Sequence, residues 1–476
     1  MSAHKPFRYK TLEELKQDIE KEHLNIALDE DLSPLSREVK IGRLTSPNSM
    51  AVLPMEGCDC NPDGSLSDLT KRRYMRYSMG GSGLIWWEAN TVSEEGKANP
   101  QALMITKKNL SSYQEFLNES RQAAKRENGI SPIQILQLTH SGRYSRPGEK
   151  PAPMAAFKDP LLDARSGVIS DEQVVTDEYL DSLTEKYVQS ALLAKEAGFD
   201  GVDIKACHKY LVSELLGAFT RKGKYGGESL ENRSRFLLQT VEAVRAAAGR
   251  DFIIGCRLNV HDVHPYPYGF GCDREDFHKW DSREPIALIQ ALVKAGVDIF
   301  ALSSSNPYYI YPQFVRPFDI PSLGVPTPEE SQLSIIEKIF EFTRTAQKAA
   351  GDVPVIGNGY SWLRQFIPNA GAANLKSHSC SMVGLGRSSF AYPDAPRDIF
   401  TKGGMDGRKT CVACSKCTQI MRDHGSTGCV VRDSQVYVPR YREARAAAEA
   451  RAAEAGAAAD TRAEAARESR GASVTE

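Results

Sequence analysis

The stretch that decides the fold is Ala197-Gly-Phe-Asp-Gly-Val-Asp-Ile204, where a predicted helix ends and a short apolar strand begins. Gly198 is expected to stop the helix, because glycine readily adopts the left-handed backbone of a helix C-terminus. The residues that follow predict a strand over 201–204. The same pattern returns at Lys294-Ala-Gly-Val-Asp-Ile-Phe-Ala-Leu302. A repeated order of helix, glycine and strand is typical of βαβ units.

Eight apolar runs rich in strand-forming residues recur between positions 50 and 390, most of them separated by segments with helical periodicity. They are Ala51–Pro54, Leu84–Trp87, Ile133–Leu138, Gly201–Ile204, Phe252–Leu258, Ile299–Leu302, Val353–Ile356 and Met382–Leu385. One intervening helix is expected to be capped by Ser229 and to bury Phe236, Leu237, Val241 and Val244. Eight strands with intervening helices predict an α/β fold, the (β/α)8 TIM barrel. A doubly wound sheet is the rival, but none of the glycine clusters has the G-x-G-x-x-G spacing that such a sheet usually carries.

The composition narrows the class of protein. The chain has 476 residues, 41% of them apolar, and a net charge of −1, so no basic surface suggests nucleic acid as a partner. No apolar run reaches membrane length, and the N-terminal residues lack the apolar core of a secretory signal. The ten cysteines do not occur in a short secreted chain, which favours reduced thiols and a cytoplasmic protein.

Four cysteines near the C-terminus suggest a metal centre. They lie in Cys411-Val-Ala-Cys414-Ser-Lys-Cys417, followed by Cys429. A C-x-x-C-x-x-C run is typical of iron–sulfur ligation. Structural zinc sites more often have two separated C-x-x-C pairs, so zinc is the second interpretation and unrelated thiols the third. An iron–sulfur cluster implies one-electron transfer to or from another group.

A TIM barrel places its active site at the C-terminal ends of the strands, and polar residues gather there in this sequence. The segments that follow the strands include Pro54-Met55-Glu56, Gln137-Leu-Thr-His140, Lys205-Ala-Cys-His208-Lys-Tyr210, Arg257, Asn306-Pro-Tyr308-Tyr309, Gly357-Asn-Gly359 and Gly384-Leu-Gly386-Arg387. The last two follow strands seven and eight, where barrels often bind phosphate through backbone N–H groups. Arg387 can add two charge-assisted hydrogen bonds. The alternative is that these glycines only form tight turns.

Several of these motifs resemble the Old Yellow Enzyme family of FMN-dependent oxidoreductases. They are Gly198-Phe-Asp-Gly-Val-Asp-Ile-Lys-Ala-Cys-His208-Lys-Tyr210-Leu, Tyr225-Gly-Gly-Glu-Ser-Leu-Glu-Asn-Arg233-Ser-Arg-Phe236, Gln137-Leu-Thr-His140-Ser-Gly-Arg143 and Gly384-Leu-Gly-Arg387. The resemblance covers roughly residues 45–435. The cysteine run is similar to that of the iron–sulfur subgroup with 2,4-dienoyl-CoA reductases, enoate reductases and trimethylamine dehydrogenase.

The resemblance implies that FMN lies across the barrel mouth, with a [4Fe–4S] cluster near its edge. The residues expected to bind the flavin are Pro54 and Met55 at the isoalloxazine, Gln137 at its pyrimidine edge, Arg257 near N1 and the C2 carbonyl, and Gly359, Gly386 and Arg387 at the phosphate. The expected cluster ligands are Cys411, Cys414, Cys417 and Cys429.

Substrate chemistry is expected on the fourth strand. In ene-reductases of this family a His/His or His/Asn pair polarises the substrate carbonyl, and a tyrosine two residues further on protonates the α-carbon. His208 and Tyr210 match the second member of the pair and the tyrosine, whereas Lys205 replaces the first member. A lysine there can bind an oxyanion or carboxylate, which favours an anionic acceptor. The alternatives are a salt-bridged Lys205 at the barrel rim and packing roles for His208 and Tyr210.

Other positions depart from the family. Glu56 stands where relatives often have a small residue near the flavin C4 carbonyl, and its carboxylate needs a partner. Tyr308 and Tyr309 follow the sixth strand, where dienoyl reductases supply a catalytic histidine. The larger relatives continue into flavin and nicotinamide domains, and no dinucleotide motif follows the cysteines here. Electrons are therefore expected either from NAD(P)H at the FMN face or through a separate electron-transfer protein.

The favoured interpretation is a cytoplasmic FMN- and [4Fe–4S]-containing oxidoreductase that reduces an activated C=C bond of a small molecule. His208 and Lys205 would polarise the acceptor and Tyr210 would donate the proton. One alternative is an amine dehydrogenase in which Trp86, Trp87, Tyr308 and Tyr309 form an aromatic bowl for an alkylammonium, although Lys205 would repel such a substrate. Another is a flavin-free lyase or aldolase with Lys205 as Schiff-base nucleophile and a zinc site.

The expected organisation has four parts: a lead-in over 1–45, the FMN-binding barrel over 46–400, the cluster segment over 401–440 and an Ala/Arg/Glu-rich tail over 441–476. The tail is expected either as a long exposed helix or as a frayed end, with no chemistry assigned. The sequence leaves the oligomeric state open, a homo-oligomer included.

Overall fold

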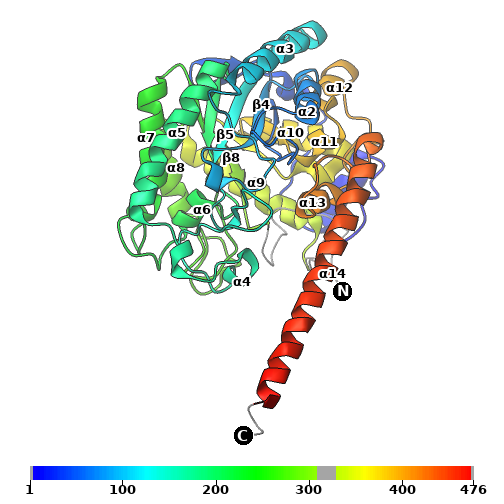
Figure 1. Cartoon of the computed structure of the whole chain (residues 1–476). Helices are drawn as coiled ribbons and strands as arrows, with labels where there is room; N and C mark the ends of the chain where they lie inside the picture. The colour runs from blue at the N-terminus through cyan, green and yellow to red at the C-terminus, as the bar shows by residue number, and fades with distance from the viewer. Residues whose placement is uncertain (1–3, 308–328, 473–476) are drawn as a thin grey trace.

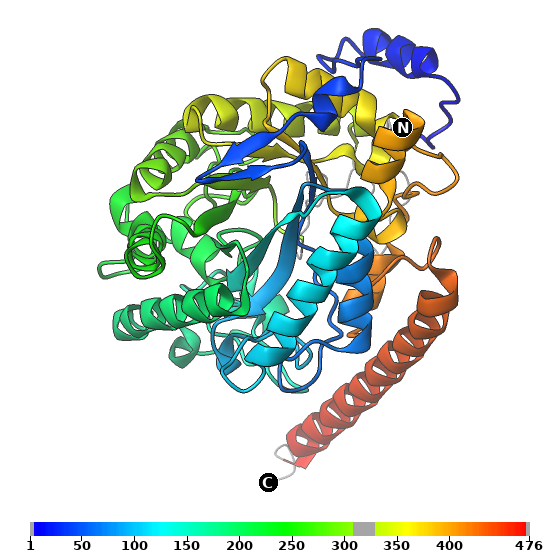
Figure 2. The same ribbon diagram turned by 90° about the horizontal axis from the view of Figure 1, so that it is seen from above.

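The computed structural model describes residues 4–307 and 329–472, and its centre is a closed barrel of eight parallel strands (Figures 1 and 2). The strands follow one another in chain order, and the last pairs with the first through Val383–Met50 and Leu385–Val52. They are β3 (Met50–Val52), β4 (Leu84–Thr91), β5 (Ile133–Thr139), β6 (Gly201–Ile204), β7 (Ile253–Asn259), β8 (Ile299–Ser303), β9 (Val355–Gly357) and β10 (Met382–Leu385). The predicted (β/α)8 barrel is confirmed, and all eight predicted strands are present.

Helices surround the barrel (Figure 2). The longer ones are α2 (Asp68–Ser78), α3 (Leu110–Asn128), α5 (Asp177–Ala197), α7 (Leu230–Ala248), α8 (Arg283–Ala295), α9 (Gln332–Ala350) and α10 (Ile367–Lys376). Shorter ones are α4 (Asp163–Ser166), α6 (Leu211–Leu216), α11 (Arg387–Ala391), α12 (Ala395–Lys402), η1 (Ser33–Ser36), η2 (Glu94–Gly96), η3 (Gly142–Tyr144), η4 (Asp171–Gln173) and η5 (Tyr360–Phe366).

The glycine that ends α5 behaves as its sequence predicts. Gly198 has φ +97°, and Gly296 plays the same part after α8 with φ +105°. Ser229 is the N-cap residue of α7, and the predicted apolar face of α7 is buried. The predicted cap position is confirmed, although the Ser229 hydroxyl makes no capping hydrogen bond within the described part of the chain.

Two apolar layers hold the barrel together. Inside it, a compact cluster includes Trp86, Ile135, Ile253 and Met382. A larger cluster fills the space between strands and helices and includes Leu136, Phe236 and Phe300. Because parallel strands are covered on both faces, they are apolar along nearly their whole length. This packing leaves the ends of the barrel as the places where polar side chains can gather.

The N-terminal segment packs on the outside of the barrel and against the starts of its strands: Lys5 bonds Gln332 of α9, and Arg43 pairs with Asp251 before β7. Helix α1 (Leu12–Lys21) is capped by Thr11, as its position in the sequence suggests. A hairpin of β1 (Val39–Ile41) and β2 (Leu44–Ser46) then contributes Ile41 to the inner cluster of the barrel. This hairpin is not among the predicted elements, because three-residue strands leave too short a pattern in the sequence.

The C-terminal segment forms α13 (Lys416–Arg422) and the long α14 (Ser434–Ala472), which extends away from the barrel (Figure 1). Of the two expectations for the tail, the helix is the one observed. Ile420 and Val430 pack with Tyr437 and Ala444 at the base of α14. Among the described residues, no helix combines the length and apolar character needed to cross a membrane.

Candidate active site

One cavity lies at the C-terminal mouth of the barrel, and eleven of the predicted site residues line it. Its volume is about 1230 Å³ including the opening to solvent, comparable to pockets that hold cofactor-sized ligands. The predicted residues in its wall are Pro54, Met55, Gln137, Lys205, His208, Tyr210, Arg257, Gly359, Gly386, Arg387 and Cys417. Segments far apart in the sequence therefore converge on one space.

Asp203, at the inner face of β6, orients two of these residues. Its Oδ2 accepts hydrogen bonds from Gln137 Nε2 at 2.5 Å and from Trp86 Nε1 at 2.9 Å. Its Oδ1 accepts from the backbone N–H of Arg257 at 2.7 Å. Burial raises the pKa of Asp203 to about 6, although these three donors stabilise the carboxylate. The Gln137 amide is thereby fixed, and its Oε1 is the atom that Asp203 does not engage.

Arg257 brings positive charge to the cavity wall. Its Nη1 donates to the carbonyl oxygen of Pro54 at 3.0 Å, which joins the ends of β7 and β3. Its Nε is buried and has no hydrogen-bond partner in the described part of the chain. A buried donor without a partner is costly, so a ligand that accepts from this guanidinium suits the site. An FMN pyrimidine edge has such acceptors, so these residues fit the flavin that the sequence implies.

The loops after β9 and β10 have the glycines that a phosphate cradle needs. Gly359 has φ +89°, a left-handed conformation that other residues adopt only with strain. Gly386 lies beside Met55 in the cavity wall, where an added Cβ would come 3.4 Å from Met55 Sδ and fill space next to the cavity. Arg387 follows directly and its Nη1 donates to Ser415 Oγ at 3.3 Å. The loops therefore fit an anionic group, with Arg387 between the cavity and the cysteine segment.

Lys205, Glu56 and Tyr210 form one group at the cavity wall. Lys205 Nζ lies 3.0 Å from Glu56 Oε1 in an ion pair, and the lysine is almost fully buried. Tyr210 donates its hydroxyl hydrogen to the same Glu56 oxygen at 3.2 Å. The ammonium also lies 3.6 Å from the centre of the Tyr210 ring, within cation–π distance. Glu56 is thus the partner of both residues. Lys205 lines the cavity and also forms a salt bridge, which the sequence left open as the alternative to substrate binding.

His208 is held in an unusual backbone conformation. His208 and Lys209 have φ of +65° and +57°, the left-handed region that non-glycine residues rarely adopt. Strained residues of this kind concentrate at functional sites, where the surrounding structure maintains them. His208 Nε2 lies 2.9 Å from Ser303 Oγ at the end of β8. The turn after β6 therefore presents His208 and Tyr210 to the same cavity.

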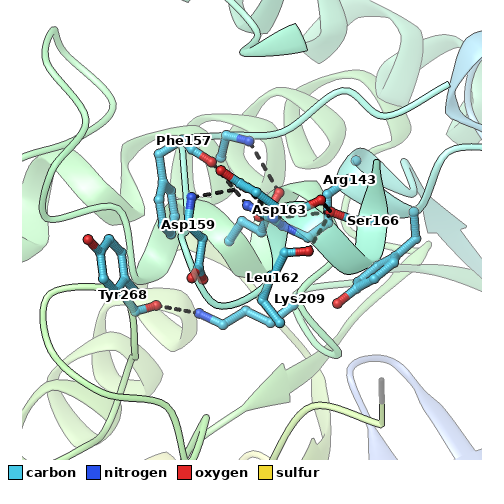
Figure 3. A network of polar contacts seen from close by, with 12 residues as sticks. Arg143, Phe157, Asp159, Leu162, Asp163, Ser166, Lys209 and Tyr268 are labelled. Carbon is cyan, nitrogen blue, oxygen red and sulfur yellow. Dashed lines mark hydrogen bonds and ion pairs between the residues drawn. The ribbon is translucent and has the colours of Figure 1, made fainter. Parts of the chain in front are cut away.

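A buried polar network supports this turn from behind (Figure 3). Lys209 Nζ forms an ion pair with Asp262 at 2.6 Å and donates to the carbonyl oxygen of Tyr268 at 2.6 Å. Nearby, Arg143 forms ion pairs with Glu214 and, at 3.0 Å, with Asp163. Breaking a buried ion pair is strongly destabilising, so these contacts resist movement of the turn.

The four cysteines lie close to one another beside the cavity. Cys417 lines it, and the other three thiols all act electrostatically on Cys417. Burial raises the pKa of Cys417 to about 12 and also raises the pKa values of Cys411 and Cys429. Arg387 opposes this increase at Cys411 and Cys417, because a nearby cation favours the thiolate. In the described residues, no three His, Cys, Asp or Glu side chains converge tightly enough to hold one metal ion.

Local geometry shapes the cysteine loop. Ala413 and Ser415 both have φ +55°, so the backbone turns sharply between the three clustered cysteines. The backbone N–H of Ala413 lies 3.4 Å from Cys411 Sγ, and that of Arg432 lies 3.3 Å from Cys429 Sγ. N–H groups directed at thiolate sulfurs are one of the ways in which proteins tune iron–sulfur centres. The donor set therefore fits an iron–sulfur cluster.

The segment is also tied to the barrel. Thr427 N–H donates to the carbonyl oxygen of Gly57 at 2.6 Å, in the loop that carries Glu56. Arg72 and Arg76 of α2 both form ion pairs with Asp433 at 2.7 Å. These contacts hold the cysteines against the barrel mouth.

The aromatic bowl predicted for an amine substrate does not form from the two tryptophans. Trp86 packs inside the barrel and donates to Asp203, and Trp87 stacks on Tyr74 at 3.6 Å between barrel and helices. The reason is that β4 is buried on both faces, so neither side chain reaches the mouth. Tyr308 and Tyr309, the other two members of the bowl, lie outside the described residues.

Several residues that line or support the cavity were not predicted. Asp203 belongs to the quoted family motif, but only the folded barrel reveals that it bonds Gln137, Arg257 and Trp86 together. Ser303, which contacts His208, could have been found from its position at a strand end. Asn358 and Ser361 also line the cavity beside Gly359.

The profile of the NADH:flavin oxidoreductase / NADH oxidase family matches residues 35–270. Among curated proteins, the chain is 28% identical over 406 residues to cinnamate reductase of Clostridium sporogenes, covering 83% of the chain and 56% of that protein. It is 31% identical over 245 residues to NADPH dehydrogenase of Bacillus velezensis, covering 50% of the chain and 68% of that protein. The chain spans about half the length of the longer curated relatives it matches.

Solved structures also resemble it in fold. A complex of 2-naphthoyl-CoA reductase superposes with a TM-score of 0.67 at 20% identity, covering 84% of this chain and 57% of that chain. At this identity the likeness shows the fold alone.

Proposed function

The chain belongs to the NADH:flavin oxidoreductase / NADH oxidase family and is an oxidoreductase, and from that premise we propose that it uses FMN and a [4Fe–4S] cluster to reduce a C=C bond conjugated to a carbonyl or carboxyl group. The observation that carries the proposal is the shared cavity. Residues suited to a flavin, residues suited to an acceptor, and Cys417 all line it. Cinnamate reductase, a relative over 83% of the chain, is named for an acceptor of this class.

When bound, FMN would supply hydride transfer to the substrate and the cluster would supply one-electron transfer. The protein's own residues would bind and orient the cofactor. Gln137 and Arg257, both fixed by Asp203, suit the polar edge of the ring. Pro54 and Met55 suit its flat face, and Gly359, Gly386 and Arg387 suit its phosphate. Cys411, Cys414, Cys417 and Cys429 would hold the cluster.

On the substrate side, Lys205 and His208 would donate hydrogen bonds to the acceptor oxygen and so polarise the C=C bond. Tyr210 would protonate the α-carbon. Because the hydroxyl of Tyr210 donates to Glu56, the carboxylate holds the hydroxyl group in place before the substrate arrives. Glu56 also neutralises Lys205, so the site is less cationic than the sequence alone suggests.

The alternatives have less support. A Schiff-base lyase needs a desolvated lysine without a counter-charge, whereas Lys205 is bound to Glu56. An amine dehydrogenase would have to bind its substrate without the two tryptophans. The electron source, NAD(P)H or a separate carrier protein, is decided by the experiment below.

The test begins with protein purified without oxygen. We expect bound FMN and about four irons per chain, the content of a cubane cluster. Adding NADH or NADPH should bleach the flavin absorbance, and cinnamate should restore it. Failure to bleach would show that a separate protein delivers the electrons. A colourless protein containing zinc would overturn the proposal in favour of the lyase.

Cys414→Ser tests the cluster separately. This variant should lose iron and keep its flavin, because the apolar clusters of the barrel do not depend on this thiol. Cys272→Ser is the control, since Cys272 lies in the loop after β7. Full iron content in the Cys414 variant would rule out its role as a ligand.

A further inference from the structure

A second cavity lies beside the first and continues from it. Glu56, Tyr210 and Met421 line both. The second cavity has a volume of about 1510 Å³ including its opening, and it lies between the loop after β5 and the C-terminal end of α13. A ligand whose reactive end reaches Tyr210 can therefore extend into it.

The charge of its wall is mostly positive. The basic side chains are Arg143, Arg146, Arg165, Arg422 and His424, and the acidic ones are Glu56 and Glu149. Arg143 is neutralised inside the protein by Glu214 and Asp163, and Glu56 by Lys205 (Figure 3 shows Arg143 with Asp163). Apart from these internal pairs, the wall contains Arg146, Arg165 and Arg422 and one acidic side chain, Glu149.

Arg146 and His424 lie in the wall of the second cavity, and Arg451 lies beside it. Arg146 Nη1 lies 2.7 Å from His424 Nδ1 and donates to the carbonyl oxygen of Glu149 through Nε at 2.9 Å. Arg451 of α14 acts electrostatically on both Arg146 and His424, and its Nη2 donates to the carbonyl oxygen of Asp423 at 2.9 Å. Within the described residues, Arg146 and Arg451 form no ion pair with a carboxylate.

Positive charge on one of these side chains disfavours the protonated form of the others. Burial, followed by Arg451, lowers the pKa of Arg146. Burial, followed by Arg146 and Arg451, lowers the pKa of His424 to about 4. At neutral pH His424 is therefore uncharged and can accept from Arg146. Glu149 partly offsets this effect at Arg146, and an anion bound near Arg146 and Arg451 would further stabilise the charged forms of both guanidinium groups.

We propose that this second cavity binds the anionic end, a phosphate or a carboxylate, of a ligand whose other end reacts at the barrel mouth, with Arg146 and Arg451 as its charge partners. Guanidinium groups suit both anions, because they donate two parallel hydrogen bonds. The placement of the reactive end rests on the proposed function, whereas the anion site does not. The ligand is either the electron acceptor or a phosphorylated nicotinamide donor, since both must reach the same mouth.

The site gives the C-terminal helix a role. α14 carries Arg451, which binds the carbonyl oxygen of Asp423 directly before the cavity residue His424, and the sequence assigned no chemistry to this helix.

A binding experiment tests the anion site without catalysis. Pyrophosphate is titrated calorimetrically into the purified holoenzyme, into Arg146→Gln and into Arg451→Gln. Each variant should weaken binding about 10-fold, the effect of removing one charge-assisted interaction. Arg126→Gln is the matched control, because Arg126 is an exposed arginine near the end of α3, which leads into the opposite end of the barrel. Equal affinity in all four proteins would overturn the proposal.

Steady-state kinetics then identify the ligand. Two acceptors that differ only in a distal carboxylate are compared, each with NADH and with NADPH. A KM increase in Arg146→Gln that is larger for the carboxylated acceptor identifies the acceptor as the ligand, and a larger increase for NADPH identifies the donor. If the KM values of the acceptors and of both nicotinamides change no more in Arg146→Gln than in Arg126→Gln, the second cavity binds neither the acceptor nor the donor. An enzyme that reduces neither acceptor but still binds pyrophosphate through Arg146 would refute the proposed reaction and retain the anion site.

Discussion

Asp203 shows how one buried side chain can organise a cofactor site. Its two oxygens accept three hydrogen bonds, from Gln137, Trp86 and the backbone of Arg257. All three partners are donors, so only a carboxylate satisfies them. A sequence motif identifies Asp203 as part of a family pattern but does not reveal these partners.

Asp203→Asn should therefore weaken flavin binding. The amide offers one acceptor oxygen and turns an N–H₂ group toward a donor, at a cost of about 1–3 kcal/mol. We expect the dissociation constant of FMN to rise about 10-fold or more, measured by flavin fluorescence after dialysis. Asp200→Asn is the control, because Asp200 bonds Arg121 and the N–H of Gln134 at the start of β6, away from the mouth. Unchanged flavin affinity with lower stability would show that Asp203 only supports the fold.

Tyr210→Phe tests the proton donor. The phenyl ring keeps the surface on which Lys205 lies but removes the hydroxyl that bonds Glu56. Reduction of the acceptor should slow about 10²-fold or more, the usual contribution of a positioned acid. Flavin reduction by the donor should change little, because no proton passes through Tyr210 in that step. Stopped-flow absorbance separates the two half-reactions, and equal slowing of both would contradict the assignment.

At the scale of elements, the cysteine segment depends on how α14 begins. Tyr437 of α14 lies against Gly428, where an added Cβ would come within 2.1 Å of the ring. The same ring belongs to the small apolar cluster that joins α13 to α14. Gly428 directly precedes Cys429, so the packing of α14 fixes the position of this thiol.

Gly428→Ala should consequently reduce the iron content, because the clash displaces Cys429 or the start of α14. Iron analysis of the purified protein measures the effect, and circular dichroism should show an intact barrel. Gly404→Ala is the control, since no atom lies within 4 Å of a Cβ at that position. Normal iron content in Gly428→Ala would show that the fourth ligand does not depend on this contact.

At the scale of the whole molecule, buried histidines make stability depend on pH. Burial lowers the pKa values of His140 and His261 to about 4, below the 6.5 of an exposed histidine. The unfolded chain therefore binds more protons between pH 4 and 6.5, and stability rises with pH in that window. Asp203, with its pKa raised to about 6, acts in the opposite direction between pH 3.8 and 6.

Burial also lowers the pKa values of His264 and His424 and raises those of Glu88 and Glu214. Because four histidines oppose three carboxyl groups, the holoenzyme should be less stable at pH 5 than at pH 7. Each buried group contributes up to about 1.4 kcal/mol per pH unit. Urea denaturation at pH 5, 6 and 7 measures the free energy of unfolding. A constant or decreasing value from pH 5 to 7 would contradict the expected uptake of protons by the unfolded chain.

The sequence by itself determined the barrel. Strand and helix periods, and glycines such as Gly198 that must adopt a left-handed backbone, are local properties, and they placed all eight strands. The strand-end rule then selected most residues of the mouth, since parallel strands all end at the same side.

Only the tertiary structure decided what those residues contact. The ion pair of Lys205 with Glu56 joins positions 149 residues apart, and Arg451 approaches Arg146 from a helix that sequence reasoning left without a role. The burial of Trp86 and Trp87, likewise, follows from coverage of β4 on both faces rather than from β4 itself. The physical reason is that charge pairing and burial depend on distances between segments remote in the chain, whereas strands and turns depend on neighbours.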